Sequence, residues 1–106
     1  MKPSLDKSNP NFIVGIGGSA GGLKAYTALL EALPSNTGMS FVFISHMSPT
    51  GDSLLAHLLS RSTNMPTVQA AEGMFLEANH VYVIPPNANL FIENYAFKVV
   101  SPRTLV

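Results

Sequence analysis

One stretch of the chain, residues 12–22 (FIVGIGGSAGG), constrains the fold more than any other. A continuous apolar run rich in β-branched residues stops abruptly in glycine, and a helical pattern begins directly afterwards. Ser19 lies among four glycines at the point where the pattern changes. This is typical of a strand, a tight turn and a helix in direct succession, because glycine permits the backbone to turn sharply. Gly17, Ser19 and Gly21 also match the Gly-x-Ser-x-Gly pattern of a nucleophile elbow.

The rest of the chain alternates between strand and helix patterns. Helical spacing of apolar residues from Ala20 to Leu33, ended by Pro34, predicts one helix, and a leucine stripe at 54–59 predicts another. Strands are expected at 12–16, 39–44, 67–70 and 81–84. A hairpin is expected over 89–92 and 95–100, joined at residues 93–94.

This order predicts an α/β fold, with a three-layer, doubly wound, mostly parallel sheet of Rossmann-like type and a C-terminal β-hairpin. Residues 1–11 are polar and contain two prolines, so we expect a flexible tail there. Residues 12–106 then form the domain portion. The pattern provides too few helices to cover both faces of the later strands, which favours a truncated domain, the N-terminal part of a larger one.

Ser19 and His46 are the residues that we expect to carry chemistry. Ser19 follows the first predicted strand and His46 closes the second. In an open α/β sheet, ligands and chemistry gather beyond the carboxyl ends of the strands, so adjacent strands would bring both side chains to one rim. A serine hydroxyl becomes an effective nucleophile when a neighbouring imidazole takes its proton. Amides at the start of the following helix favour negative charge that develops nearby.

A phosphate-binding turn is the alternative interpretation of the glycines, and a purely structural turn is a third. The dinucleotide pattern normally has an acidic residue near the end of the second strand, where this chain has Ser45 and His46. A Walker loop requires Gly-Lys-Ser/Thr, whereas Lys24 is followed by Ala25. The residue pattern therefore favours a nucleophile over a nucleotide site without excluding the latter.

The other titratable residues are given structural interpretations. His57 lies off the leucine stripe of its helix and is expected at the surface, and His80 opens a strand. No histidines have the spacing of metal ligands on a helix and no carboxylates cluster, so neither a metal nor a cofactor is expected. A catalytic triad also needs a carboxylate, and Asp6, Asp52, Glu72 and Glu77 are all poorly placed to supply one.

Composition limits the partners. The formal net charge is +0, so no basic surface for nucleic acid is indicated. No stretch is long enough to span a membrane, and no signal peptide is recognisable. There is no cysteine. We expect a cytoplasmic protein.

Five blocks of the chain resemble the CheB-type protein-glutamate methylesterases of chemotaxis. They are VGIGGSAGG at 14–22, FISHMSP at 43–49, MP at 65–66, AEGM at 71–74 and NHVYVIPP at 79–86. The blocks follow the family's order and extend from residue 14 to residue 86, which makes the resemblance specific. The segments at 48–49 and 81–87 are most similar to family members that are fused to a methyltransferase domain.

The resemblance implies a serine esterase that hydrolyses methyl esters of glutamate on the cytoplasmic helices of chemoreceptors, and often deamidates glutamines there. Ser19 matches the nucleophile and His46 the base. Gly18, Ala20 and Gly21 match the turn and its oxyanion-stabilising amides. Many family members have threonine where this chain has Ala20, so a hydroxyl contribution at that position is not expected. The family's acid lies in a downstream Gly-Met-Gly-x-Asp-Gly-type segment that is absent from these 106 residues. The chain alone is therefore expected to be inactive, and a non-catalytic homologue remains a further alternative.

Overall fold

The computed structural model describes residues 9–18, 22–45 and 54–101. Six strands and two helices lie within these residues. In chain order they are β1 (Ile13–Gly18), α1 (Leu23–Ala32), β2 (Ser40–Ser45), α2 (Leu54–Ser60), β3 (Thr67–Gln69), β4 (His80–Val83), β5 (Asn89–Glu93) and β6 (Ala96–Val100).

Four of the strands form one parallel sheet in the order β1-β2-β4-β3. β1 and β2 pair along their whole length, from Ile13 opposite Ser40 to Gly18 opposite Ser45. β5 and β6 form a separate antiparallel hairpin. The parallel sheet has β1 at one edge and β3 at the other.

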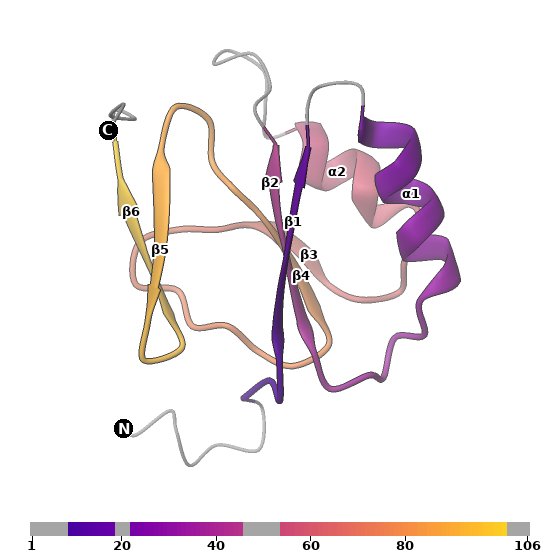
Figure 1. The fold of residues 1–106 in the computed structure, drawn as a ribbon, viewed down its shortest axis with the longest axis horizontal. Helices are drawn as coiled ribbons and strands as arrows, with labels where there is room; N and C mark the ends of the chain where they lie inside the picture. The colour runs from indigo at the N-terminus through magenta and orange to yellow at the C-terminus, as the bar shows by residue number, and fades with distance from the viewer. Residues whose placement is uncertain (1–8, 19–21, 46–53, 102–106) are drawn as a thin grey trace.

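The direction of the two crossover connections explains why both helices lie on the same face of the sheet. The connections from β1 to β2 and from β2 to β3 move the same way across the sheet. Right-handed crossovers that move in one direction place their helices on the same face. Figure 1 shows this arrangement, with both helices on one side of the sheet and the β5–β6 hairpin on the other.

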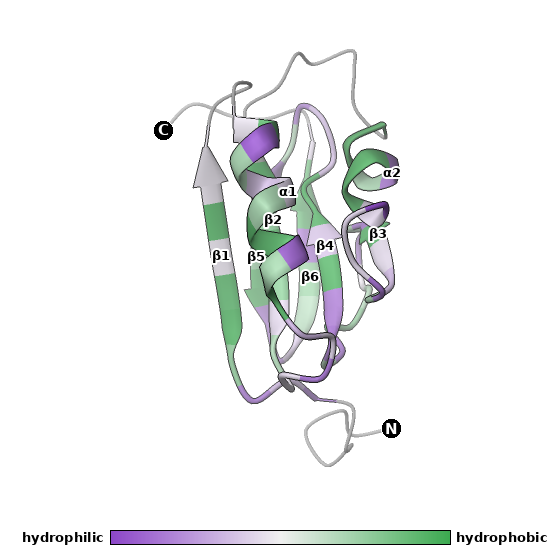
Figure 2. Ribbon diagram, turned by 90° about the vertical axis from the view of Figure 1, so that its right-hand side faces the viewer, coloured by the Kyte–Doolittle hydropathy of each residue, from purple (hydrophilic) through white to green (hydrophobic). Residues whose placement is uncertain are grey.

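The core on the helix side is formed by alternate residues of the central strands and by the inner faces of the helices. Phe41, Phe43, Val81 and Val83 project from the sheet, and Tyr26, Leu30, Leu55 and Leu59 meet them from the helices. Figure 2 shows the apolar parts of α1 and α2 lying over the apolar strands. A strand covered on both faces must be apolar throughout, which explains the continuous runs of β2 and β4.

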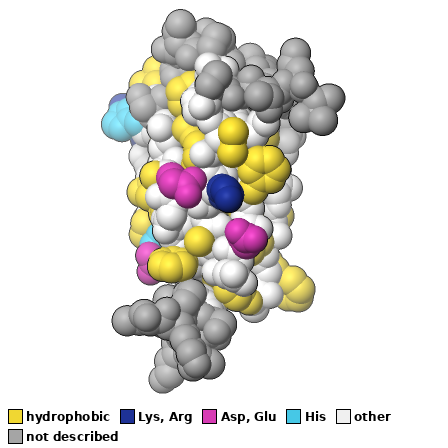
Figure 3. All heavy atoms as spheres, turned by 90° about the vertical axis from the view of Figure 1, so that its left-hand side faces the viewer, with side chains coloured by type: hydrophobic (Ala, Val, Ile, Leu, Met, Phe, Trp, Pro, Cys, Tyr) yellow, Lys and Arg dark blue, Asp and Glu magenta, His cyan; other side chains and the backbone are white. Residues whose placement is uncertain are grey.

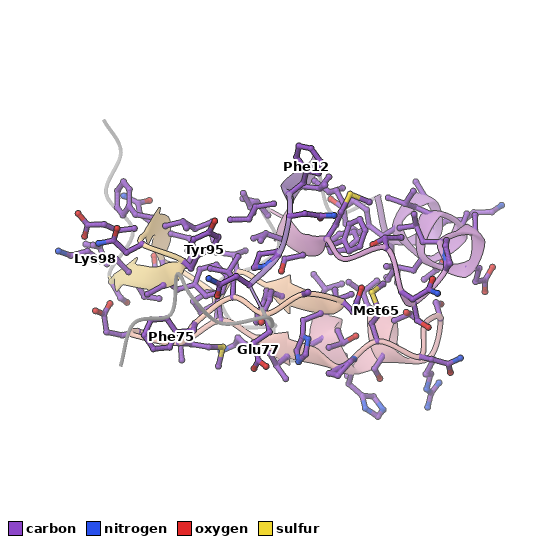
Figure 4. The ribbon with its side chains drawn as sticks, turned by 90° about the horizontal axis from the view of Figure 1, so that it is seen from below. Phe12, Met65, Phe75, Glu77, Tyr95 and Lys98 are labelled. Atoms are coloured by element: carbon purple, nitrogen blue, oxygen red, sulfur yellow. The ribbon has the colours of Figure 1, made fainter. Side chains whose placement is uncertain are left out.

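The second core lies between the sheet and the hairpin. Val42 and Tyr82 face Phe97 of β6 and Leu76 of the β3–β4 connection. That connection is bonded to the hairpin turn, where Leu76 N–H donates to the Tyr95 carbonyl at 2.7 Å, and to β6, where Phe97 N–H donates to the Met74 carbonyl at 2.8 Å. Figure 4 shows Phe75, Tyr95 and Lys98 on the hairpin side and Met65 toward the helices. The outer face of the hairpin mixes charged and hydrophobic side chains (Figure 3).

The predicted α/β fold with a mostly parallel sheet and a hairpin is confirmed. The first strand continues to Gly18 rather than ending at residue 16, because its edge pairing with β2 extends into the glycines. The hairpin turn was expected at 93–94 but lies at Asn94–Tyr95, because Glu93 pairs with Ala96. Both described helices lie on one face, and the hairpin occupies the other.

Candidate active site at the carboxyl ends of β1 and β2

The candidate site lies where β1 and β2 end. Gly18 and Ser45 are opposite each other in the parallel register and are the last residues of their strands. Ser19 directly follows Gly18, and His46 directly follows Ser45. The adjacent strands that the sequence analysis required are therefore present. Ser19, Ala20, Gly21 and His46 themselves lie outside the described residues.

The N-terminus of α1 adjoins this rim, and no side chain of the described residues caps it. Gly22 is the N-cap residue and makes no side-chain hydrogen bond, and the first turn contains no acidic residue. The first amides of a helix have no partner within it and carry the positive end of its dipole. An uncapped N-terminus at a sheet rim therefore favours negative charge, whether on an oxyanion or on a phosphate.

The Tyr26 ring explains two of the glycines. A side chain at Gly18 would overlap the Tyr26 hydroxyl, and a Cβ at Gly22 would lie 3.0 Å from the Tyr26 Cζ. Tyr26 was not predicted from the sequence, although Leu23, Tyr26, Leu30 and Leu33 recur at helical spacing and all pack in the helix-side core. That spacing was the signal that could have identified it.

The two glutamates that were considered as the acid of a triad, Glu72 and Glu77, make contacts away from the candidate site. Glu72 accepts a hydrogen bond from Val99 N–H at 2.7 Å, beside the hairpin. Glu77 lies 3.9 Å from the His80 Nε2, at the amino end of β4. Neither is therefore available beside the carboxyl ends of β1 and β2. Asp6 and Asp52 lie outside the described residues.

The two described histidines have the surroundings that the sequence analysis expected. His57 is exposed on α2. His80 is part of the backbone framework, since its Nδ1 lies 2.8 Å from the Ala78 carbonyl and its ring stacks on Tyr82. Within residues 9–18, 22–45 and 54–101, no group of three potential ligands is arranged to hold a metal.

A surface hollow of about 620 Å³ lies away from the candidate site. It is lined by the C-terminal turn of α1 and the loop after it, together with residues 61–64. The hollow adjoins the C-terminal ends of both helices, whereas the candidate site adjoins the N-terminus of α1. It is open and mostly polar, so we do not connect it with the chemistry of Ser19.

Comparison with known proteins identifies the family. The sequence model described as CheB methylesterase matches residues 14–105, which is most of the chain. The chain belongs to the CheB methylesterase family. The five sequence blocks that indicated this family lie within the matched residues.

Curated CheB-family relatives are similar over most of this chain. A putative protein-glutamate methylesterase/protein-glutamine glutaminase of Leptospira interrogans is 35% identical over 78 residues, covering 74% of this chain and 40% of the relative. The corresponding enzyme of Nitrosospira multiformis is 30% identical over 92 residues, covering 87% of this chain and 26% of the relative. The chain thus spans well under half the length of these relatives.

The CheB fold is also evident in a solved structure. The catalytic domain of Thermotoga maritima CheB methylesterase matches with a TM-score of 0.76 and 26% identity. The match covers 88% of this chain and 51% of that domain.

No helix among the described residues is long and apolar enough to cross a membrane.

Proposed function

We propose that the protein carrying this chain is a protein-glutamate methylesterase in which Ser19 is the nucleophile and His46 the general base. Ser19 attacks the ester carbonyl, His46 takes its proton and passes it to the leaving methoxide, and methanol departs. Water then hydrolyses the acyl-enzyme by the same route in reverse. No metal or cofactor takes part in these steps.

The pairing of Gly18 with Ser45 is the observation that supports this proposal most directly. It brings the residues immediately before Ser19 and His46 into one register at the end of two hydrogen-bonded strands. A residue that directly follows a hydrogen-bonded strand is held in a defined position, and a nucleophile and its base both need such a defined position. The amides at the N-terminus of α1 lack a side-chain cap among the described residues, and we propose that they help to stabilise the oxyanion. In the sequence, Ala20 and Gly21 lie between Ser19 and this helix.

The substrate class follows from the family. The named relatives act as protein-glutamate methylesterases and protein-glutamine glutaminases. We therefore expect methyl-glutamates, and glutamines in the same setting, on the cytoplasmic helices of chemoreceptors. A fused methyltransferase domain and a cytoplasmic location belong to the same proposal, with neither nucleic acid nor membrane insertion involved.

Release of methanol tests the proposal. The full-length protein should release methanol from a methylated receptor fragment, and Ser19→Ala or His46→Ala should lower kcat at least 1,000-fold, about the loss expected for a catalytic nucleophile or base. Ser35→Ala and His57→Ala are matched controls, because both residues are exposed and neither belongs to the candidate site. Full activity in Ser19→Ala would contradict the assignment.

The acid of the triad gives a second prediction. Residues 1–106 alone should release methanol at less than a thousandth of the full-length rate, because His46 then lacks the carboxylate that holds its tautomer; loss of that group alone costs about 10⁴-fold in a related triad. The measurement compares equal concentrations of both proteins. Equal rates would mean that a carboxylate within these residues supplies the function.

Phosphate binding is the second candidate, and the uncapped N-terminus of α1 favours it. Isothermal titration with dinucleotides and with inorganic phosphate separates it from the esterase. Saturable binding that survives Ser19→Ala, without methanol release by the wild type, would favour the phosphate site. A protein with neither property would be a non-catalytic homologue.

A further inference from the structure

The surface hollow at the C-terminal ends of α1 and α2 has the size of a ligand site. Its volume is about 620 Å³, and ligand sites in proteins usually measure about 300–1,000 Å³. Figure 1 shows α1 running from the carboxyl end of β1 back toward the amino ends of the strands. The hollow and the candidate active site therefore lie at opposite ends of this helix, and a ligand in the hollow would not occupy the active site.

The wall of the hollow that α1 provides is negative. Glu31 lies in the last turn of α1, where no basic residue is present. A helix carries the negative end of its dipole at its C-terminus, and its last carbonyls have no partners within the helix. Pro34 follows this end and has no N–H to donate to those carbonyls. The sequence thus places an acidic side chain where a basic one would stabilise the helix, and such local conflicts are expected mainly at functional sites.

The wall that follows α2 provides hydrogen-bond donors. The Arg61 N–H ends the helix by donating to the Leu58 carbonyl at 3.3 Å, and the Arg61 side chain lines the hollow. The N–H groups of Thr63 and Asn64 donate to no acceptor among the described residues. The next N–H, that of Met65, donates to the Thr63 hydroxyl at 3.0 Å. A guanidinium followed by free backbone N–H groups is a set of donors suited to a carboxylate.

Glu31 and Arg61 do not neutralise each other within the protein. Both side chains are exposed and line the same hollow, yet neither makes an ion pair or a hydrogen bond with another described residue. The side-chain amides of Asn36 and Asn64 line it as well and are also without a hydrogen bond to the described residues. The hollow therefore presents one negative wall, one positive wall and two free amide groups.

We propose that this hollow binds a zwitterionic amino acid. Its ammonium group contacts Glu31 and the last carbonyls of α1, and its carboxylate contacts Arg61 and the free N–H groups that follow it. A ligand with a single charge would leave one wall unpaired, so charge complementarity favours a molecule that carries both charges. The free amides of Asn36 and Asn64 favour a polar side chain. This site does not depend on the esterase activity proposed above.

Isothermal titration of the full-length protein with L-serine, L-asparagine and L-glutamine tests the proposal. At least one of these amino acids should bind saturably. Its derivatives with an acetylated α-amino group or an amidated α-carboxyl group, which each lack one charge, should bind about tenfold more weakly, as expected for loss of a charge-assisted hydrogen bond. Amide hydrogen exchange in a peptide covering residues 61–64 should also slow on binding, because the free N–H groups there gain an acceptor.

Glu31→Gln and Arg61→Gln test the two walls separately. Each should weaken binding of the same amino acid about tenfold. Glu93→Gln and Lys98→Gln remove the same charges from exposed positions on the hairpin and should leave binding unchanged. Glu31→Gln should also raise the melting temperature, because it removes a negative charge from the C-terminus of α1. A variant that is more stable and binds more weakly cannot have lost binding through unfolding.

Absence of binding by all three amino acids would overturn the proposal, as would equal binding of the singly charged derivatives. Equal losses in the hairpin variants would also overturn it, because the effect would then be one of net charge. A lower melting temperature in Glu31→Gln would mean that a group within the protein already pairs with this carboxylate, and the negative wall would not be free. These readouts do not involve methanol release, so failure of the esterase proposal is seen independently.

Discussion

Three buried hydroxyls of the described residues differ in their hydrogen bonding. The Ser40 hydroxyl donates to the Glu77 carbonyl, and the Tyr82 hydroxyl accepts from the Glu77 N–H and donates to the Phe75 carbonyl. Together they anchor the β3–β4 connection to the sheet. The Tyr26 hydroxyl has no such partner among the described residues and lies beside the candidate site.

Alkaline pH should destabilise the protein through Tyr82. Burial raises the pKa of this phenol above its ordinary value of 10.0; the hydrogen bond from the Glu77 N–H opposes the shift and the Glu77 carboxylate adds to it. Below about pH 10 the phenol is protonated in both the folded and unfolded states and adds no pH dependence. Above that pH the unfolded state loses its proton first, so the free energy of unfolding falls.

Urea unfolding from pH 8 to 11 measures this effect. The free energy of unfolding of the wild type should fall more steeply above about pH 10 than that of Tyr82→Phe, by at most about 1.4 kcal/mol per pH unit for one proton. The variant should also be less stable at pH 8, since the Glu77 N–H loses its acceptor. Parallel curves for the two proteins would contradict the proposed origin of the pH dependence.

At the scale of elements, the hairpin illustrates what the sequence could not specify. The alternation of residues 89–100 predicted two strands, but the turn was wrong by one residue. Asn94 and Tyr95 both have positive φ, at 55° and 64°. A two-residue turn with both central residues in this region is type I′, which favours Asn-Gly. Tyrosine is unusual at the second position, so no turn signal is present at residues 94–95 in the sequence.

Tyr95→Gly should therefore raise the free energy of unfolding by about 1 kcal/mol, because glycine adopts positive φ without the cost that tyrosine bears. The bond from Leu76 N–H to the residue 95 carbonyl is kept in this variant. Asn94→Gly is the matched control and should gain less, since asparagine tolerates this conformation. Thermal unfolding measures both, and a loss of stability in Tyr95→Gly would mean that packing of the ring outweighs backbone strain.

At the scale of the whole molecule, the apolar runs around Phe43 and Val81 were enough to predict buried parallel strands, but not their order in the sheet. Ser19 and His46 were expected at one rim on the condition that their strands are adjacent, and β1 and β2 do pair. The placement of both helices on one face depends on the direction of each crossover across the sheet, which local patterns do not encode. Helical spacing was enough to assign Tyr26 to the core, but its close approach to Gly18 is a tertiary contact that local spacing does not predict.

The face of β1 turned away from the helices is exposed. Val14 and Ile16 pack in the helix-side core, whereas Ile13, Gly15 and Gly17 alternate with them and are exposed. A Cβ built on Gly15 would meet nothing within 4 Å. Glycine in a strand often marks a place where another backbone approaches closely. Within the described residues no such segment is present at Gly15.

Gly15→Ala should accordingly stabilise the 106-residue chain by about 0.4–1 kcal/mol, because alanine restricts the unfolded state and fits the strand without a clash. Gly18→Ala on the same strand is the matched control. It should destabilise the chain, since its methyl group would overlap the Tyr26 hydroxyl. Denaturant unfolding of the three proteins measures both effects. A loss of stability in Gly15→Ala would mean that a segment outside the described residues is seated on this face, and glycine would then be required there by packing.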